Sequence, residues 1–115
     1  MTDFKGFAIA ASLLALAAPT TAASNKDTAD CMQFVNPDLQ LAGCARYLQS
    51  AGLSNEQRSI GHSNRCSAFG KKRDFDHALA ECDEAIRLNP KSSVAYNYRC
   101  NVLIHHGEYD RAIPD

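Results

Sequence analysis

The sequence repeats itself with a period of 34 residues. When residues 59–81 are placed on residues 93–115, five of the 23 positions are identical. The identical pairs are Ser59/Ser93, Arg65/Arg99, Cys66/Cys100, Asp76/Asp110 and Ala78/Ala112. A period in this range is typical of stacked-repeat proteins, in which a single unit cannot bury its apolar face alone. The repeat therefore predicts a surface that binds a partner rather than a cleft that performs chemistry.

Apolar residues within the repeat follow the spacing of an α-helix. Between residues 74 and 88 they recur on one helical face. They are Phe75, Ala78, Leu79, Cys82, Ala85 and Ile86. Pro90 ends this helix because it lacks an N–H group and disfavours helical conformation in the residue before it. A preceding helix is expected over residues 55–72, with Ser54 as its N-cap and Gln57 completing a capping box.

The same pattern extends one period toward the N-terminus. Four residues lie 34 positions before members of the apolar stripe just described, namely Leu41, Cys44, Ala45 and Leu48. They predict a helix that is opened by Asn36-Pro37-Asp38 and closed by Gly52. The polar stretch over residues 25–35 supplies a short partner helix. We therefore expect an all-α fold of antiparallel helix–turn–helix hairpins stacked as a short solenoid.

Two stretches of the sequence resemble the tetratricopeptide repeat (TPR). The likeness covers residues 59–113, and a weaker one covers residues 36–52. It is carried by A-I-x-L-x-P at residues 85–90 and by G-x-Y-x-x-A at residues 107–112, together with the period of 34. The resemblance implies that small residues let the two helices of a hairpin pack closely while large residues fill the space between hairpins.

Some positions depart from the TPR pattern. His62 stands where the next repeat has Tyr96, at a position that usually holds a large aromatic residue. Arg73 replaces the turn glycine that the next repeat has as Gly107. These departures weaken packing or turn geometry but leave the period intact.

The pattern divides the chain into four segments. They are a signal peptide at 1–23, a degenerate N-terminal hairpin with the lead-in to the next helix at 24–58, a first TPR at 59–92, and a second, truncated TPR at 93–115. The last unit stops inside its second helix, so we expect this end to fray or to dock. The unfinished C-terminal hairpin also offers a surface for self-association.

An apolar run near the N-terminus is typical of a secretory signal peptide. Residues 7–18 form 12 consecutive residues without a charge, followed by Pro19 and small residues. The run is too short for a membrane span, which needs about 20 apolar residues. Cleavage after Ala22 or after Ala23 fits equally well, and no membrane association is expected after cleavage. The alternative is a buried N-terminal helix. The leader favours an exported protein, periplasmic in a Gram-negative bacterium.

The chain has five cysteines, a high count for its length. Small exported domains often rely on disulfides. Cys31 and Cys44 fall on the two facing helices of the N-terminal hairpin, so we expect a disulfide there; the alternative is two separate small core residues. Cys66 and Cys100 occupy equivalent places in successive hairpins, about 8–10 Å apart, too far to pair. Cys82 can approach either, and buried thiols are the favoured interpretation of these three.

Composition and spacing argue against several functions. The formal net charge of −1 does not favour nucleic acid, because phosphate binding needs a basic face. No Cys-x-x-Cys occurs, which disfavours redox catalysis and structural zinc. His105 and His106 are adjacent on a helix and point about 100° apart, which disfavours a shared metal. We therefore expect no enzyme activity, no metal and no cofactor.

The resemblance also places a binding surface. In TPR proteins the first helix of each hairpin lines the concave face, where a protein or peptide ligand binds. Carried over to this sequence, the partner-binding candidates are Ser63, Ser67 and Lys71 from one repeat and Asn97, Asn101 and His105 from the next. Side-chain amides can bind a peptide backbone or a carboxylate. The plain alternative is that these are solvated polar positions.

The interpretation that follows is a non-catalytic protein–protein interaction module of an exported protein. Two alternatives stay open. One is a secreted thiol–disulfide protein whose cysteines are the active groups. Thiol titration would distinguish it from the interaction module, because only the former requires a reactive thiol of low pKa. The other is a truncated TPR fragment without independent function, which would lack cooperative unfolding.

Overall fold

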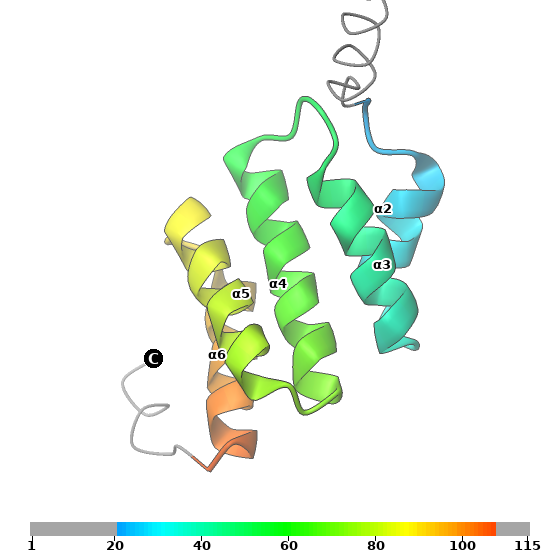
Figure 1. Cartoon of the computed structure of the whole chain (residues 1–115). Coiled ribbons are helices and arrows are strands. Elements are labelled where there is room, and N and C mark those ends of the chain that lie inside the picture. The colour runs from blue at the N-terminus through cyan, green and yellow to red at the C-terminus, as the bar shows by residue number, and fades with distance from the viewer. Residues whose placement is uncertain (1–20, 108–115) are drawn as a thin grey trace, which may run out of the picture.

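A computed structural model describes residues 21–107, and within that range the chain forms helices joined by short loops, with no β-strand (Figure 1). The helices are α2 (Asn25–Met32), α3 (Pro37–Leu48), α4 (Asn55–Lys71), α5 (Phe75–Leu88) and α6 (Ser93–His105). The expectation of an all-α fold is confirmed for this part of the chain. None of the helices in it is long and apolar enough to cross a bilayer. Most of the expected signal peptide, and the expected helix after residue 107, lie outside the described residues.

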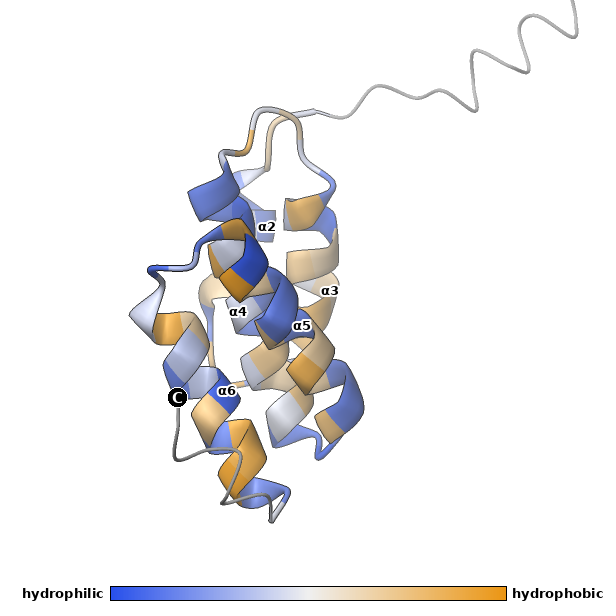
Figure 2. Cartoon of the chain, turned by 90° about the vertical axis from the view of Figure 1, so that its left-hand side faces the viewer, coloured by the Kyte–Doolittle hydropathy of each residue, from blue (hydrophilic) through white to orange (hydrophobic). Residues whose placement is uncertain are grey.

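Consecutive helices run antiparallel and pack in two layers, with α2, α4 and α6 in one and α3 and α5 in the other, and α4 is central (Figure 1, Figure 2). It packs against α3 on one side and α5 on the other, and it also contacts α2 and α6. The first helices of the successive hairpins, α2, α4 and α6, therefore lie next to one another. This adjacency positions the candidate site described below.

Each helix begins at a side chain that caps its first turn. Ser24, Asn36, Ser54, Asp74 and Ser92 each accept a hydrogen bond from the backbone N–H three residues on. Such caps satisfy an N–H group that has no partner within the helix. At Ser54 the side-chain oxygen of Gln57 in turn accepts a hydrogen bond from the Ser54 N–H, which confirms the expected capping box. The helix boundaries follow from these short sequence motifs.

The end of α3 differs from the expectation. The helix ends at Leu48 with Gln49 as its C-cap, and Gly52 lies three residues further along. Gly52 adopts a φ of 79°, a left-handed conformation that glycine accepts without steric cost. It therefore turns the chain toward α4 instead of closing α3 directly.

Two disulfides each join the helices of one hairpin. Cys31 and Cys44, the pair expected from the sequence, connect α2 and α3 with their Cα atoms 4.4 Å apart. Cys66 and Cys82 connect α4 and α5 with Cα atoms 5.3 Å apart. The interpretation of Cys66 and Cys82 as buried thiols was wrong: the two helices run antiparallel in contact, which brings these positions within bonding distance.

Each disulfide lies at the centre of its own apolar cluster. In the first hairpin, Cys31 and Cys44 pack with Tyr47, and Met32, Leu48 and Leu53 cover them. In the second, the buried members are Cys66, Ala78, Cys82 and Val102, with Phe69, Phe75, Leu79 and Tyr98 packed against them. The side chains of α6 thus complete the core of the hairpin before it.

The two helices of the first hairpin approach very closely at Gly43. A Cβ atom there would lie 2.4 Å from the Cβ of Asp30 and 2.7 Å from the backbone nitrogen of Cys31. No real side chain fits at these distances, so glycine is needed for this contact. It lets the disulfide form across an unusually narrow helix pair.

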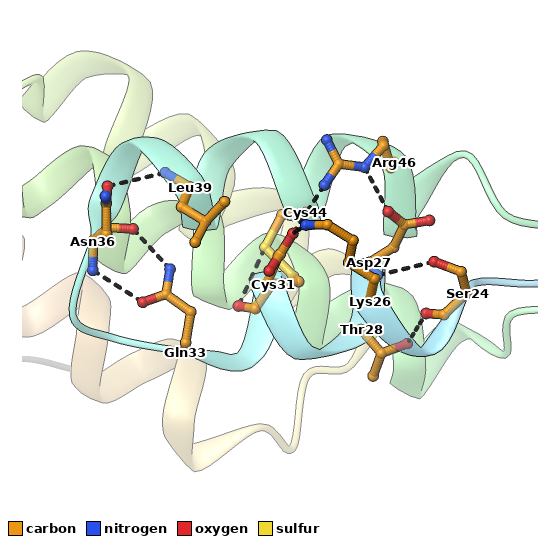
Figure 3. A network of polar contacts seen from close by, with 11 residues as sticks. Ser24, Lys26, Asp27, Thr28, Cys31, Gln33, Asn36, Leu39, Cys44 and Arg46 are labelled. Atoms are coloured by element: carbon orange, nitrogen blue, oxygen red, sulfur yellow. Dashed lines mark hydrogen bonds and ion pairs between the residues drawn. A yellow bond between two sulfur atoms is a disulfide. The ribbon is translucent and has the colours of Figure 1, made fainter.

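A polar network covers the outside of the same hairpin (Figure 3). The guanidinium of Arg46 donates to Asp27 at 2.5 Å and to Asp30 at 3.1 Å. Hydrogen bonding from Arg46 holds the pKa of Asp27 below its ordinary value. In the loop that follows, the amide of Gln33 donates to the carbonyl of Asn36 and its oxygen accepts from the Asn36 N–H. These contacts connect α2 to α3 at both ends.

Candidate binding groove

A pocket of about 560 Å³ lies between the end of α2, the exposed turns of α4, and α6 with the loop before it. Its apolar wall contains Phe34, Ile60 and Val94, residues that are 48%, 43% and 48% exposed. Ser63 and Tyr98 also line it. Apolar groups this open to water gain free energy when a partner covers them.

A second pocket of about 230 Å³ follows one to two helical turns further along α4 and α6. The polar side chains at its margin are Ser67, Lys71, Asn101 and His105. Beneath them lie the aromatic rings of Phe75 and Tyr98 and the nearly buried Val102. Tyr98 lines both pockets, so the two adjoin at this residue along the contact between α4 and α6, and together they are called the groove below.

The polar residues expected from the sequence are distributed unequally over this groove. Ser67, Lys71, Asn101 and His105 meet in the smaller pocket. Ser63 lies in the larger one but is only 1% exposed, and its hydroxyl has no hydrogen-bond partner among the described residues. Asn97 is exposed on α6 and lines neither pocket.

Lys71 connects the two pockets. Lys71 lines the smaller pocket, and its ammonium donates a hydrogen bond to the carbonyl oxygen of Phe34, a residue of the larger pocket, at 2.5 Å. The same ammonium lies over the ring of Phe34, 5.3 Å from the ring centre, in a cation–π contact. The positive charge is therefore held beside the apolar wall and keeps unused N–H donors, since an ammonium has three.

The apolar part of the groove was not predicted from the sequence. Ile60 and Val94 are one period apart in the repeat alignment, and Ile60 is at helical spacing from Ser63, Ser67 and Lys71. That spacing was the available signal for a shared face. Phe34 had no such signal, because it enters the groove from the loop between α2 and α3.

A charged cluster lies between α4 and α5. His62 Nδ1 is 2.7 Å from Glu81, and Arg65 contacts the other oxygen of the same carboxylate at 3.0 Å. His62 thus replaces the aromatic residue of the TPR pattern with a polar contact between the helices of one hairpin. Among residues 21–107, no three histidine, cysteine or acidic side chains are arranged to hold a metal ion.

Burial and hydrogen bonding shift two pKa values near the groove. Burial raises the pKa of Tyr98, so its hydroxyl stays protonated and can donate to a ligand. A hydrogen bond from His77 lowers the pKa of Asp74, the N-cap of α5. Asp74 lines neither pocket.

Comparison with known proteins gives one distant similarity. Over 81 residues, 70% of this chain, the sequence is 28% identical to tetratricopeptide repeat protein 6 of Homo sapiens. The chain spans 13% of the length of that relative. No family model matches the chain, and no solved structure matches it. This weak likeness favours a repeat of the TPR kind, in agreement with the all-helical hairpins.

Proposed function

We propose that this protein is a non-catalytic interaction module of the TPR type, whose groove along α2, α4 and α6 binds a segment of another protein. The observation that carries the proposal is the pair of adjoining pockets that share Tyr98. They lie on the side formed by the first helix of each hairpin. The distant similarity to a TPR protein supports the same function.

The groove has the composition expected of a protein-binding surface. Phe34, Ile60 and Val94 are each close to half exposed, and covering such groups contributes about 25 cal/mol for each Å² removed from water. A bound segment would therefore be stabilised by covering these apolar residues.

The alternative of a thiol–disulfide protein is less well supported. Reactive cysteines are partly exposed and have stabilised thiolates. All four cysteines in the two disulfides are 0% exposed and lie within the apolar clusters. These bonds are placed to stabilise the hairpins.

Export to an oxidising compartment, the periplasm of a Gram-negative bacterium, is part of the proposal. It rests on the apolar run at residues 7–18 and on two disulfides, which persist in such compartments. Fractionation of cells that express the full chain should find a shortened product outside the cytoplasm. A product of full length in the cytoplasm would overturn this part.

A pull-down with groove variants tests the binding function. Ile60→Glu introduces a charge into the apolar wall, and Ala80→Glu introduces the same charge at an exposed position of α5 outside both pockets. A protein captured by the wild type and by Ala80→Glu, but not by Ile60→Glu, supports the groove. Equal capture by all three overturns it. Sedimentation of the wild type tests self-association through the last hairpin.

A further inference from the structure

The rim of the larger pocket has two halves that come from successive repeats. In one half, Glu56 in the first turn of α4 lies one helical turn before Ile60. In the other half, Val94 in the first turn of α6 follows Lys91, which lies in the loop before that helix. Because α4 and α6 contact each other, the two halves lie side by side.

Each half of the rim carries an apolar residue beside an unused charge. Ile60 and Val94 are both close to half exposed. Of the described residues that line this pocket, Glu56 is the only acidic and Lys91 the only basic one. Both are exposed, and neither side chain forms an ion pair or a hydrogen bond with another described residue. The two halves therefore match in apolar character and are opposite in charge.

A surface of this kind is complementary to itself. A two-fold axis that runs between α4 and α6 would place each half of the rim on the opposite half of a second copy. In such an interface both copies use the same surface, so every contact occurs twice. Glu56 of one copy would meet Lys91 of the other, and Ile60 would pack on Val94. Both charges and both apolar residues would thereby acquire partners.

The two charges favour a second copy over an unrelated protein segment at this surface. An unrelated segment could cover Ile60 and Val94, but nothing about the apolar wall requires it to carry a base and an acid at the matching positions. A second copy brings both, because its own rim holds the complementary half. Complementary charges of this kind fix the orientation in which two surfaces meet.

We propose that the rim of the larger pocket is the interface of a symmetric homodimer, in which Glu56 of each copy pairs with Lys91 of the other. The inference goes beyond the proposed function, because the dimer requires no other protein. It also differs from association through the unfinished last hairpin, because it requires Glu56 on α4. A segment bound in the groove would compete with the second copy for the same apolar residues.

Sedimentation of the full chain, with charge-reversal variants, tests the inference. The wild type should change from monomer to dimer as its concentration rises from about 1 µM to about 1 mM. Glu56→Lys and Lys91→Glu should each weaken dimerisation about tenfold, because each replaces two contacts between opposite charges by two between like charges. Added salt should reduce this difference, since both charges are exposed.

A mixture of the two variants tests whether the contact is reciprocal between copies. A copy with Glu56→Lys has two bases at the rim, and a copy with Lys91→Glu has two acids. The mixture should therefore form heterodimers at concentrations where each variant alone is a monomer. An ion pair within one copy would not be restored in this way.

Asp76→Lys is the matched control for these variants. Asp76 is exposed in the first turn of α5, as Glu56 is in the first turn of α4, and it lines neither pocket. The variant has the same net charge as Glu56→Lys and should dimerise like the wild type. Circular dichroism verifies that each variant is folded.

Several results would overturn the inference. They are a monomer over the whole concentration range, dimerisation that is unchanged in Glu56→Lys and Lys91→Glu, equal weakening by Asp76→Lys, and a mixture of the two rim variants that stays monomeric. The proposed function fails separately, when the pull-down shows no difference between Ile60→Glu and Ala80→Glu.

Discussion

Arg73 and Gly107, one period apart, have the same left-handed backbone conformation. Their φ angles are 60° and 82°. The N–H of each donates to the carbonyl three residues earlier, Gly70 and Ile104 respectively, at 3.0 Å in both cases. The turns that end α4 and α6 therefore each require a residue with positive φ. Arginine accepts this conformation only at a cost, because its Cβ approaches the adjacent carbonyl.

Replacing Arg73 by glycine should stabilise the protein. Relief of the left-handed strain outweighs the greater freedom that glycine gives the unfolded chain, so we expect the free energy of unfolding to rise by about 1 kcal/mol. Urea denaturation measures the change. Arg73→Ala keeps the Cβ atom and should show no gain; a gain of the same size in Arg73→Ala would place the strain in the side chain rather than in the backbone.

Replacing Gly43 by alanine should destabilise the first hairpin. The added Cβ would lie 2.4 Å from the Cβ of Asp30 and 2.7 Å from the nitrogen of Cys31, so the helices must separate. The free energy of unfolding should fall by about 1–3 kcal/mol, although alanine is a better helix former than glycine. Gly70→Ala is the control, since its new Cβ meets only a methyl group of Val102, at 3.2 Å. Thermal melts that rank the two variants in the opposite order would contradict this account.

Removing either disulfide should lower the free energy of unfolding by about 3 kcal/mol. The two effects should be similar in size because the bonds close loops of similar length, with separations of 13 and 16 residues. The effects should differ in location. Cys31→Ala with Cys44→Ala should increase amide exchange in α2 and α3 while α5 and α6 stay protected, since the two apolar clusters are separate. Hydrogen-exchange mass spectrometry resolves the two hairpins. Uniform loss of protection along the chain would show that they unfold as one unit.

The ion pair of Arg46 and Asp27 should make the first hairpin sensitive to acid. Hydrogen bonding to Arg46 lowers the pKa of Asp27, so its stabilising contribution is present above the ordinary pKa and is lost as the pH falls below about 4. Both side chains are partly exposed, so the effect is small and decreases with salt. Arg46→Gln should flatten the dependence of Tm on pH in this range. Lys91→Gln, which removes a cation outside the network, should leave the slope unchanged.

Local sequence motifs were sufficient to predict the helices, but the second disulfide and the apolar wall depend on tertiary contacts. Ser54 with Gln57, and Asn36 before Pro37, mark helix starts because capping involves neighbours within a few residues. Cys82 had two partners within reach of its helix, and only the packing of α5 on α4 selects Cys66. Phe34 joins the groove through a loop whose path no periodicity describes.

The covalent bonds of this protein have a consequence for how it can change shape. Both disulfides lie inside a hairpin, and among the described residues no disulfide joins α3 to α4 or α5 to α6. Each hairpin is thus braced internally, while successive hairpins are joined covalently only by the backbone of the loop between them. Oxidation therefore fixes how the two helices of a hairpin pair and leaves the angle between hairpins to non-covalent contacts.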